Sequence, residues 1–344
     1  MSQAYITNNI ENASMPFTLT WLAARDTVIL AVSALNALCQ HSDSKEETYC
    51  DYVESNADDP EGPPKMLPLE VTVLRALRNI GAKYYPGYES CGQNDKFNYV
   101  VMGLVGKNID SLRKTLPNKR FALRSCLHIG IRSILSLEEI HRAGYLHRDL
   151  KPANMCIGRA PNDLRSVYIL DWGLCRQYVN STTGKPHRPR VRAGFRGTPR
   201  YASANALNDI DQGRVDDMWS WFFGIIELTV GVLPWDSDQN APNEINAYMR
   251  WLGKKKQECI QDMALACQGC PKEFGNIYTV LIKMQFADKP DYDYFIACQK
   301  DVMARKNFRE ESPLDWEPQN ELAKMTQVVP NATMMHNENR RRSY

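Results

Sequence analysis

Residues His147 to Asn154 read HRDLKPAN, and Asp171-Trp172-Gly173 follows 22 residues after Asp149. The second motif comes directly after a short apolar run, residues 167–170, which is typical of a buried strand. Transfer of a γ-phosphoryl group needs an acceptor for the proton of the substrate hydroxyl, metal ligands for the triphosphate, and a cation for the developing charge. The two motifs contain a residue for each of these tasks and therefore indicate phosphoryl transfer.

The polar residues of the two motifs can be assigned to separate roles. Asp149 fits the catalytic base, and Lys151 is close enough along the chain to reach the transferring phosphate. Asn154 and Asp171 can ligate magnesium, because that hard ion prefers amide and carboxylate oxygens. Each residue alone could belong to a capped turn at the end of a strand. The complete set at these spacings favours the phosphoryl-transfer interpretation.

Hydrophobic periodicity predicts the elements around these motifs. Apolar residues recur at helical spacing in three segments, and two β-branched, apolar runs have the length of buried strands. The predicted helices are 66–77, 123–140 and 215–230, and the predicted strands are 98–105 and 167–170. The third helix is crowded with aromatic residues, so we expect it to be deeply buried.

Composition limits the class of protein. The chain has 344 residues, of which 43% are hydrophobic and 24% charged, which excludes a mainly disordered, fibrous or multi-span membrane protein. Its length fits one bilobal domain or two small ones. Lys and Arg number 42 against 40 Asp and Glu, so no overall field attracts nucleic acid. We expect no nucleic-acid or membrane partner.

The cysteines and the N-terminal apolar run favour the cytoplasm. Ten cysteines are scattered along the chain, as expected of reduced thiols, and Cys267-x-x-Cys270 has no second pair to complete a zinc site. The apolar run 27–38 is too short to span a bilayer. A secreted protein that uses this run as a signal is an alternative, and it predicts glycosylation at Asn12 or Asn331.

From about Lys65 to Glu317 the chain resembles eukaryotic protein kinases of the casein kinase 1 superfamily, and within it the tau-tubulin kinase-like branch. The resemblance covers roughly three quarters of the sequence. It rests on NYVVMGLVGKNIDSLR (98–113), GYLHRDLKPANM (144–155), AGFRGTPRYASANAL (193–207), GRVDDMWSWFFGIIEL (213–228), FADKPDYDYF (286–295) and DWE (315–317).

The resemblance implies an α+β, two-lobed protein kinase fold, with a small β-rich N-lobe and a larger, mainly helical C-lobe that clamp ATP between them. The N-lobe is atypical here. The boundaries expected on this basis are an atypical N-terminal segment at 1–48, a partial N-lobe at 49–102, the C-lobe at 103–317 and a polar, disordered tail at 318–344.

The resemblance also implies further site residues. Met102 matches the gatekeeper residue, and Gly103 and Leu104 match the hinge whose backbone meets the adenine. Glu70 matches the helix glutamate that pairs with the lysine that binds the α- and β-phosphates of ATP.

In the larger lobe, Thr198 matches the residue that touches Asp149 and Lys151, and Asp217 matches the buried aspartate that braces the catalytic loop. Lys151 in this context implies Ser/Thr rather than Tyr substrates. The implied cofactors are ATP and Mg²⁺.

Residues 172–208 contain seven Lys or Arg and no Asp or Glu. The seven are Arg176, Lys185, Arg188, Arg190, Arg192, Arg196 and Arg200. Guanidinium groups pair bidentately with phosphate and carboxylate, so this cationic segment predicts acidic or already phosphorylated protein substrates. A solvated basic loop is the alternative. The residues predicted to bind substrate anions are Arg176, Arg190, Arg192, Arg196 and Arg200.

The sequence departs from the kinase pattern near its start. No glycine precedes Gly62, so no glycine-rich phosphate loop lies upstream of it, and Tyr52 stands where the family has its phosphate-binding lysine. A phenol cannot replace an ammonium, and neither Lys45 nor Lys65 lies on a convincing strand. Either the segment before about residue 50 is not the native first lobe, or the protein is a pseudokinase. Trp172 replaces the usual Phe, and a large aromatic residue can still pack there.

Two functions therefore compete. The first is an ATP- and magnesium-dependent protein serine/threonine kinase, which the complete set of base, cation and metal ligands favours. The second is a catalytically inactive pseudokinase that acts as a scaffold and binds acidic or phosphorylated partners through the cationic segment. The missing lysine and glycine-rich loop favour the second and leave the activity of this chain open.

Overall fold

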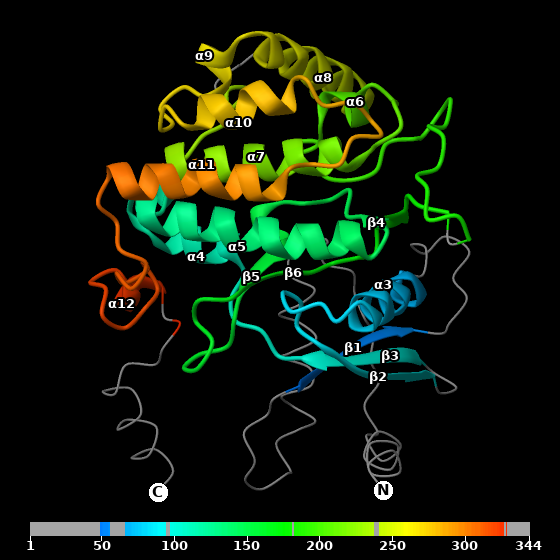
Figure 1. Cartoon of the computed structure of the whole chain (residues 1–344), viewed down its shortest axis with the longest axis horizontal. Helices are drawn as coiled ribbons and strands as arrows, with labels where there is room; N and C mark the ends of the chain where they lie inside the picture. The colour runs from blue at the N-terminus through cyan, green and yellow to red at the C-terminus, as the bar shows by residue number, and fades with distance from the viewer. Residues whose placement is uncertain are drawn as a thin grey trace, which may run out of the picture. The chain divides into compact units, whose positions relative to one another are not determined.

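The structure is a computed structural model, shown in Figure 1. It describes residues 49–55, 66–93, 97–180, 182–236, 241–326 and 328, with the backbone alone for 49–55 and 97. The N-terminal apolar run, Lys45, Lys65, and the sequons at Asn12 and Asn331 lie outside the described residues. The chain divides into two compact units, one with residues up to 67 and 87–104, the other with 68–86 and the chain from 105 onward.

The first unit contains an antiparallel sheet of three strands, β1 (Tyr49–Ser55), β2 (Tyr88–Gln93) and β3 (Phe97–Gly103). Strand β3 is central, which explains its apolar sequence and the full burial of Val100. It confirms the predicted strand and ends at Gly103, two residues earlier than expected. In the backbone register, Tyr52 on β1 lies opposite Val100 on β3.

The second unit is mainly helical. Its helices are α3 (Leu67–Asn79, whose first residue lies at the boundary between the units), α4 (Ile109–Thr115), α5 (Leu123–Arg142), α6 (Ala204–Leu207), α7 (Arg214–Val230), α8 (Ile245–Gln261), α9 (Met263–Ala266), α10 (Phe274–Leu281), α11 (Tyr292–Arg305) and α12 (Ala323–Thr326). Two short antiparallel pairs join β4 (Tyr145–Leu146) to β7 (Arg176–Gln177), and β5 (Met155–Ile157) to β6 (Val167–Ile169). Helices α3, α5 and α7 and strand β6 confirm the four remaining predicted elements.

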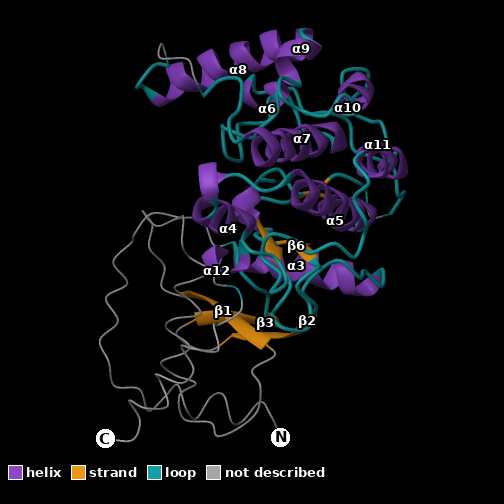
Figure 2. Cartoon of the chain, turned by 90° about the vertical axis from the view of Figure 1, so that its left-hand side faces the viewer, coloured by secondary structure: helices purple, strands orange, loops and turns teal. Residues whose placement is uncertain are grey.

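Helix α7 forms the centre of this unit, as its aromatic sequence predicted. Figures 1 and 2 show α5, α7 and α11 side by side. Trp221, Phe222 and Phe223 of α7 are at most 1% exposed. The indole of Trp221 donates a hydrogen bond to Ser133 Oγ on α5 (3.1 Å) and meets the ring of Phe295 on α11 at a centroid distance of 6.2 Å. A helix buried on all sides in this way fixes the positions of the elements around it.

The DWE motif at 315–317 packs near the N-terminus of α5. Asp315 Oδ2 accepts a hydrogen bond from the backbone N–H of Ala122 at the helix start (2.7 Å), and the indole of fully buried Trp316 donates to Leu164 O (2.8 Å). Glu317 forms a bidentate ion pair with Arg165. Asp315 thereby satisfies a backbone N–H at the start of α5, and Trp316 and Glu317 attach the same motif to residues 164 and 165.

The predicted disordered tail at 318–344 has to be shortened. Helix α12 lies inside it, Thr326 is buried, and Lys107 Nζ donates a hydrogen bond to Thr326 O (2.9 Å). Residues 329–344 lie outside the described part of the chain. No helix in the described ranges is long and apolar enough to cross a membrane.

Candidate active site

The two polar motifs meet in the second unit because short strands position them. The loop predicted to be catalytic, residues 147–154 and hereafter the catalytic loop, connects β4 to β5, and Asp171 follows the end of β6. The pairing of β5 with β6 continues beyond the strands, where Leu170 N donates to Asn154 O (2.8 Å). This bond brings Asp171 next to Asn154, as the spacing of the motifs predicted.

Asp149, Lys151 and Thr198 form one hydrogen-bonded group. Lys151 Nζ lies 2.6 Å from Asp149 Oδ2 and 2.9 Å from Thr198 Oγ1. The second carboxylate oxygen, Asp149 Oδ1, is buried and has no hydrogen-bond partner among the described residues. A buried acceptor without a donor is costly, so this oxygen is suited to a donor from outside the chain, such as a substrate hydroxyl.

Asn154 and Asp171 fit the predicted magnesium ligands. Asn154 Nδ2 donates to Asp149 O (3.0 Å) and Asp149 Oδ2 (3.3 Å) and lies 3.4 Å from Asp171 Oδ2. The amide nitrogen is thereby turned toward the carboxylates, which leaves the amide oxygen for a cation. The described residues contain no group of three or more His, Cys, Asp or Glu side chains that could hold a metal alone. Magnesium needs fewer protein ligands when phosphate oxygens complete its coordination.

The electrostatics of Asp171 support the same assignment. Burial raises the pKa of its carboxyl, and the negative charge of Asp149 adds to this effect, while the charges of His147 and Lys151 oppose it. A buried carboxylate with a raised pKa is stabilised by a bound cation. Asp171 also has a positive φ of 67°, a conformation that Asp tolerates better than most residues.

Asp217 of α7 holds the backbone of the catalytic loop by hydrogen bonds. Its carboxylate accepts hydrogen bonds from the backbone N–H groups of His147 (2.7 Å) and Arg148 (2.8 Å) and contacts His141 Nε2 (2.9 Å). Burial alone would raise the pKa of Asp217, but the hydrogen bond and charge of His141 with the backbone donors hold it below its ordinary value. The loop turns sharply here, because Arg148 has a φ of 66°.

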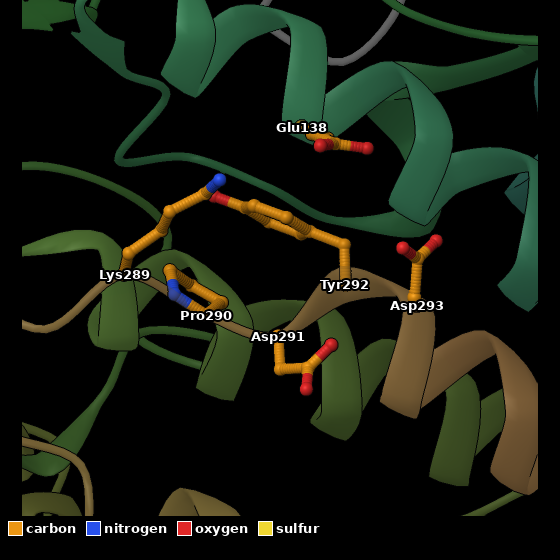
Figure 3. A pocket seen from close by; sticks show the side chains of 6 residues that line it. All are labelled: Glu138, Lys289, Pro290, Asp291, Tyr292 and Asp293. Atoms are coloured by element: carbon orange, nitrogen blue, oxygen red, sulfur yellow. The ribbon is translucent and has the colours of Figure 1, made fainter.

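A chain of contacts extends this support toward the surface. The hydroxyl of Tyr292 lies 2.7 Å from His141 Nδ1. Tyr292 also lines a surface pocket of about 280 Å³. Figure 3 shows the side chains that line it, Glu138, Lys289, Pro290, Asp291, Tyr292 and Asp293. None of the buried side-chain N or O atoms that lack a partner in the described residues belongs to this lining.

Gly197 lets the segment before Thr198 approach the catalytic loop. Its φ is 115°, and a Cβ atom at this position would lie 2.4 Å from the backbone oxygen of Arg148. Only glycine combines this backbone conformation with so close a contact. Gly197 was not among the residues predicted from the sequence, although a glycine directly before the predicted contact residue Thr198 was an available signal.

The residues predicted to bind ATP lie in both units. Met102 and Gly103 end strand β3, and Leu104 follows it in the first unit. Glu70 is buried in the first turn of α3 in the second unit. Burial chiefly, together with the charges of Asp217 and Glu70, raises the pKa of the Cys175 thiol well above its ordinary value.

The arginines of the cationic segment divide into two groups. Arg176 and Arg190 both pair with the carboxylate of Asp211, Arg190 through its backbone N–H (2.9 Å) and its guanidinium (2.8 Å). The two guanidinium groups lower the pKa of Asp211 to about 2 against the effect of burial. The count of basic residues between 172 and 208 missed Asp211, because it lies three residues beyond that segment.

Arg200 is also paired within the protein. It contacts Glu227 of α7 (2.8 Å) and Asp236, and these carboxylates raise its pKa although burial opposes them. Internal ion pairs engage the guanidinium groups of Arg176, Arg190 and Arg200, and their binding of substrate anions stays a prediction. Arg192 and Arg196 are exposed, as is neighbouring Arg188, and none of the three makes an ion pair with a described residue.

Replacing Asp211 by Asn tests whether this carboxylate fixes the cationic segment. At pH 7 we expect the variant to lose about 1–2 kcal/mol of stability, the range for partly exposed hydrogen bonds to a charged group. The folded-state pKa is depressed, so the contribution is present above about pH 4 and is lost as the pH falls through about 2.

The measurement is the thermal unfolding of both proteins between pH 7 and pH 2. The difference in Tm should stay constant down to about pH 4 and then shrink. Asp301→Asn on the exposed face of α11 is the matched control and should leave the Tm unchanged. A difference in Tm that persists at pH 2 would show that Asp211 does not act through its charge.

Sequence comparisons identify the family to which the chain belongs. The family model for the protein kinase domain matches residues 36–290. A protein of Dictyostelium discoideum named as a probable serine/threonine-protein kinase is 35% identical over 264 residues, which cover 74% of this chain and 49% of the relative. The serine/threonine-protein kinase spe-6 of Caenorhabditis elegans is 34% identical over 255 residues, covering 73% of this chain and 65% of the relative.

A Caenorhabditis elegans protein whose name assigns it to casein kinase I is 29% identical over 255 residues, which cover 74% of this chain and 71% of the relative. Of the two relatives described first, the matched residues span about half the length of the Dictyostelium protein and about two thirds of spe-6. The mixed helix and strand content, with helix predominating, agrees with the predicted α+β, two-lobed fold. The chain belongs to the protein kinase family, among relatives that are serine/threonine kinases.

Proposed function

We propose that this chain is a protein serine/threonine kinase that uses ATP and Mg²⁺, and that it belongs to the tau-tubulin kinase-like branch of the casein kinase 1 superfamily. The observation that carries the proposal is the hydrogen-bonded group of five side chains, Asp149, Lys151, Asn154, Asp171 and Thr198, in which every link is 3.4 Å or shorter. Its members correspond in type to the base, the cation and the metal ligands of phosphoryl transfer.

The unpartnered oxygen of Asp149 would accept the proton of the substrate hydroxyl. Lys151, held by Asp149 and Thr198, would place its ammonium where charge develops on the transferred phosphoryl group. Asn154 and Asp171 would hold magnesium, which would neutralise phosphate charge. Because Asp217 fixes the backbone of the loop, the base needs little rearrangement when a substrate arrives.

We propose acidic or phosphorylated proteins as substrates. The support is the set of exposed arginines without an ion pair among the described residues, Arg188, Arg192 and Arg196, which lie shortly before Thr198. Guanidinium groups that are already solvated can pair with phosphate or carboxylate at low cost. The near balance of the overall charge argues against nucleic acid as a partner. The location in the cytoplasm stays a prediction.

The second candidate function is a pseudokinase scaffold. The observation that favours it is Tyr52, which lies on strand β1 at the position expected for the phosphate-binding lysine. A scaffold would bind acidic partners through the same arginines but would not turn over ATP.

Asp149→Asn tests the proposed catalysis. General-base catalysis contributes about 10²–10⁴-fold, so transfer of labelled phosphate from Mg-ATP to an acidic protein should fall by that factor. The variant keeps the size of the side chain, and its thermal unfolding should match that of the unmodified protein. Asp301→Asn is the control for loss of one negative charge. If the unmodified protein and Asp149→Asn are equally silent although folded, the chain as given is not an active kinase.

Tyr52→Lys separates the two candidate functions. If the missing ammonium limits an otherwise complete site, restoring it should raise kcat/KM for ATP by roughly tenfold or more, the scale of one electrostatic group at a reacting phosphate. Tyr52→Met is the matched control, because it removes the phenol without adding a charge. A folded Tyr52→Lys protein that still transfers no phosphate would favour the scaffold.

Replacing Arg188, Arg192 and Arg196 together by Gln tests the substrate class. We expect KM for an acidic or phosphorylated peptide to rise about tenfold while KM for ATP is unchanged, because these side chains would contact the peptide only. The fold should be unaffected, since the three residues are exposed. An equal KM for acidic and neutral peptides in the unmodified protein would contradict the proposed preference.

A further inference from the structure

Lys256 of α8 is fully buried, which is rare for a lysine. Its two neighbours in the sequence behave as surface residues: Lys254 is exposed, and Lys255 is partly exposed and lies 3.6 Å from Glu258. In the described part of the chain no carboxylate forms an ion pair with Lys256. A buried ammonium without a counter-ion needs other compensation, because its desolvation is costly.

Three backbone carbonyls supply that compensation. Lys256 Nζ donates hydrogen bonds to the oxygens of Pro199 (2.8 Å), Arg200 (2.8 Å) and Ala202 (2.6 Å). Three acceptors match the three N–H groups of an ammonium, whereas a neutral amine would offer only two.

Two aromatic rings complete the environment of the ammonium. It lies 4.4 Å from the ring centroid of Trp235 and 5.0 Å from that of Phe223. Both distances are within the range of cation–π attraction, which is strongest at a desolvated site. Burial chiefly, and then the charge of Arg200, lower the pKa of Lys256, whereas the nearby Cys259 and Asp236 raise it. The carbonyl acceptors and the ring faces favour the charged form of the amine.

The three carbonyls belong to the turn that carries Thr198. The backbone N–H groups of Tyr201 and Ala202 both donate to Thr198 O (3.0 Å each), so the turn directs its N–H groups inward and its carbonyls toward α8. At the other end of the turn, Thr198 Oγ1 accepts a hydrogen bond from Lys151 (2.9 Å). The turn therefore contacts the catalytic loop on one side, through Thr198, and the ammonium of Lys256 on the opposite side.

We propose that Lys256 is a positioning residue that fixes the turn at 198–202 in the conformation in which Thr198 meets Lys151. The expected effect on phosphate transfer rests on the proposed kinase function. The expected effect on the conformation of the turn does not depend on that function. Loss of the ammonium leaves one buried and two part-buried carbonyls without this donor, so the turn has to change conformation to satisfy them. The side chain of Thr198 then leaves Lys151.

The test is hydrogen–deuterium exchange of full-length protein, unmodified and with Lys256→Met. Exchange of the Tyr201 and Ala202 amides should be at least tenfold faster in the variant, while α11 (292–305) keeps its protection. Lys254→Met removes the same charge from the same helix and should exchange like the unmodified protein. Unchanged exchange at the turn, or an equal increase in α11, would overturn the proposal.

Lys256→Arg keeps the experiment decisive if Lys256→Met does not fold. A guanidinium retains the charge but is planar, so its N–H groups cannot converge on the three carbonyls as an ammonium does. We expect a folded protein with about tenfold faster exchange at Tyr201 and Ala202. Normal exchange there, or failure of both Lys256 variants to fold, would refute a role confined to the turn.

Steady-state kinetics test whether the conformation of the turn affects phosphate transfer. If the unmodified chain transfers phosphate, Lys256→Met should lower kcat for the protein substrate or raise its KM by about tenfold, with KM for ATP unchanged. An equal loss for both substrates would contradict positioning of the turn. If the unmodified chain transfers no phosphate, the proposed function fails, and the exchange experiment still decides the role of Lys256.

Discussion

The carboxylate of Asp217 is the contact on which the geometry of the catalytic loop depends. It lies 1% exposed in α7 and accepts the backbone N–H groups of His147 and Arg148, at a turn where Arg148 has a positive φ. Each buried N–H left without an acceptor would cost about 1–3 kcal/mol, so the turn is stable only while the carboxylate is present. Because α7 packs against α5 and also meets rings of α10 and α11, the carboxylate is held in place by the helical core itself. The position of Asp149 thus follows from the packing of helices that contribute nothing to the chemistry.

Periodicity and motif spacing predicted the parts of the fold that are local in sequence. Helices α5 and α7 have clear apolar spacing, and the HRDLKPAN motif identified the loop that brings Asp149 and Asn154 together. Helix α8 was not predicted, since its sequence is polar on average and its buried lysine resembles a surface residue in the sequence. Lys256 contacts carbonyls 54 to 57 residues away, and no local pattern reports such a pairing. Backbone carbonyls are chemically alike at every residue, so their partners cannot be found from side-chain composition.

The cationic segment shows why counting charges along the chain is a poor guide to a surface. Seven basic residues within 172–208, an interval that contains no Asp or Glu, suggest one continuous cationic surface. In the fold, Asp211, Glu227 and Asp236 come from outside the counted segment and neutralise Arg176, Arg190 and Arg200. The paired arginines order the segment, and the exposed ones without an ion pair are those proposed to bind substrate anions. The two groups are therefore expected to respond differently to mutation, the first through stability and the second through binding.

The departures from the kinase pattern and the residues of the chemical step lie in different parts of the chain. Tyr52 is on β1 of the first unit, whereas the residues proposed as base, cation and metal ligands are in the second unit and contact or lie close to Asp217, Gly197 and the turn held by Lys256. The phosphate-binding lysine of kinases acts on the α- and β-phosphates, while Asp149 and Lys151 would act on the hydroxyl and the γ-phosphoryl group. A tyrosine at position 52 thus removes a group that positions the nucleotide and leaves the proton acceptor untouched. The defect expected from it is poor use of ATP, with a catalytic loop that is still arranged to deprotonate a substrate hydroxyl.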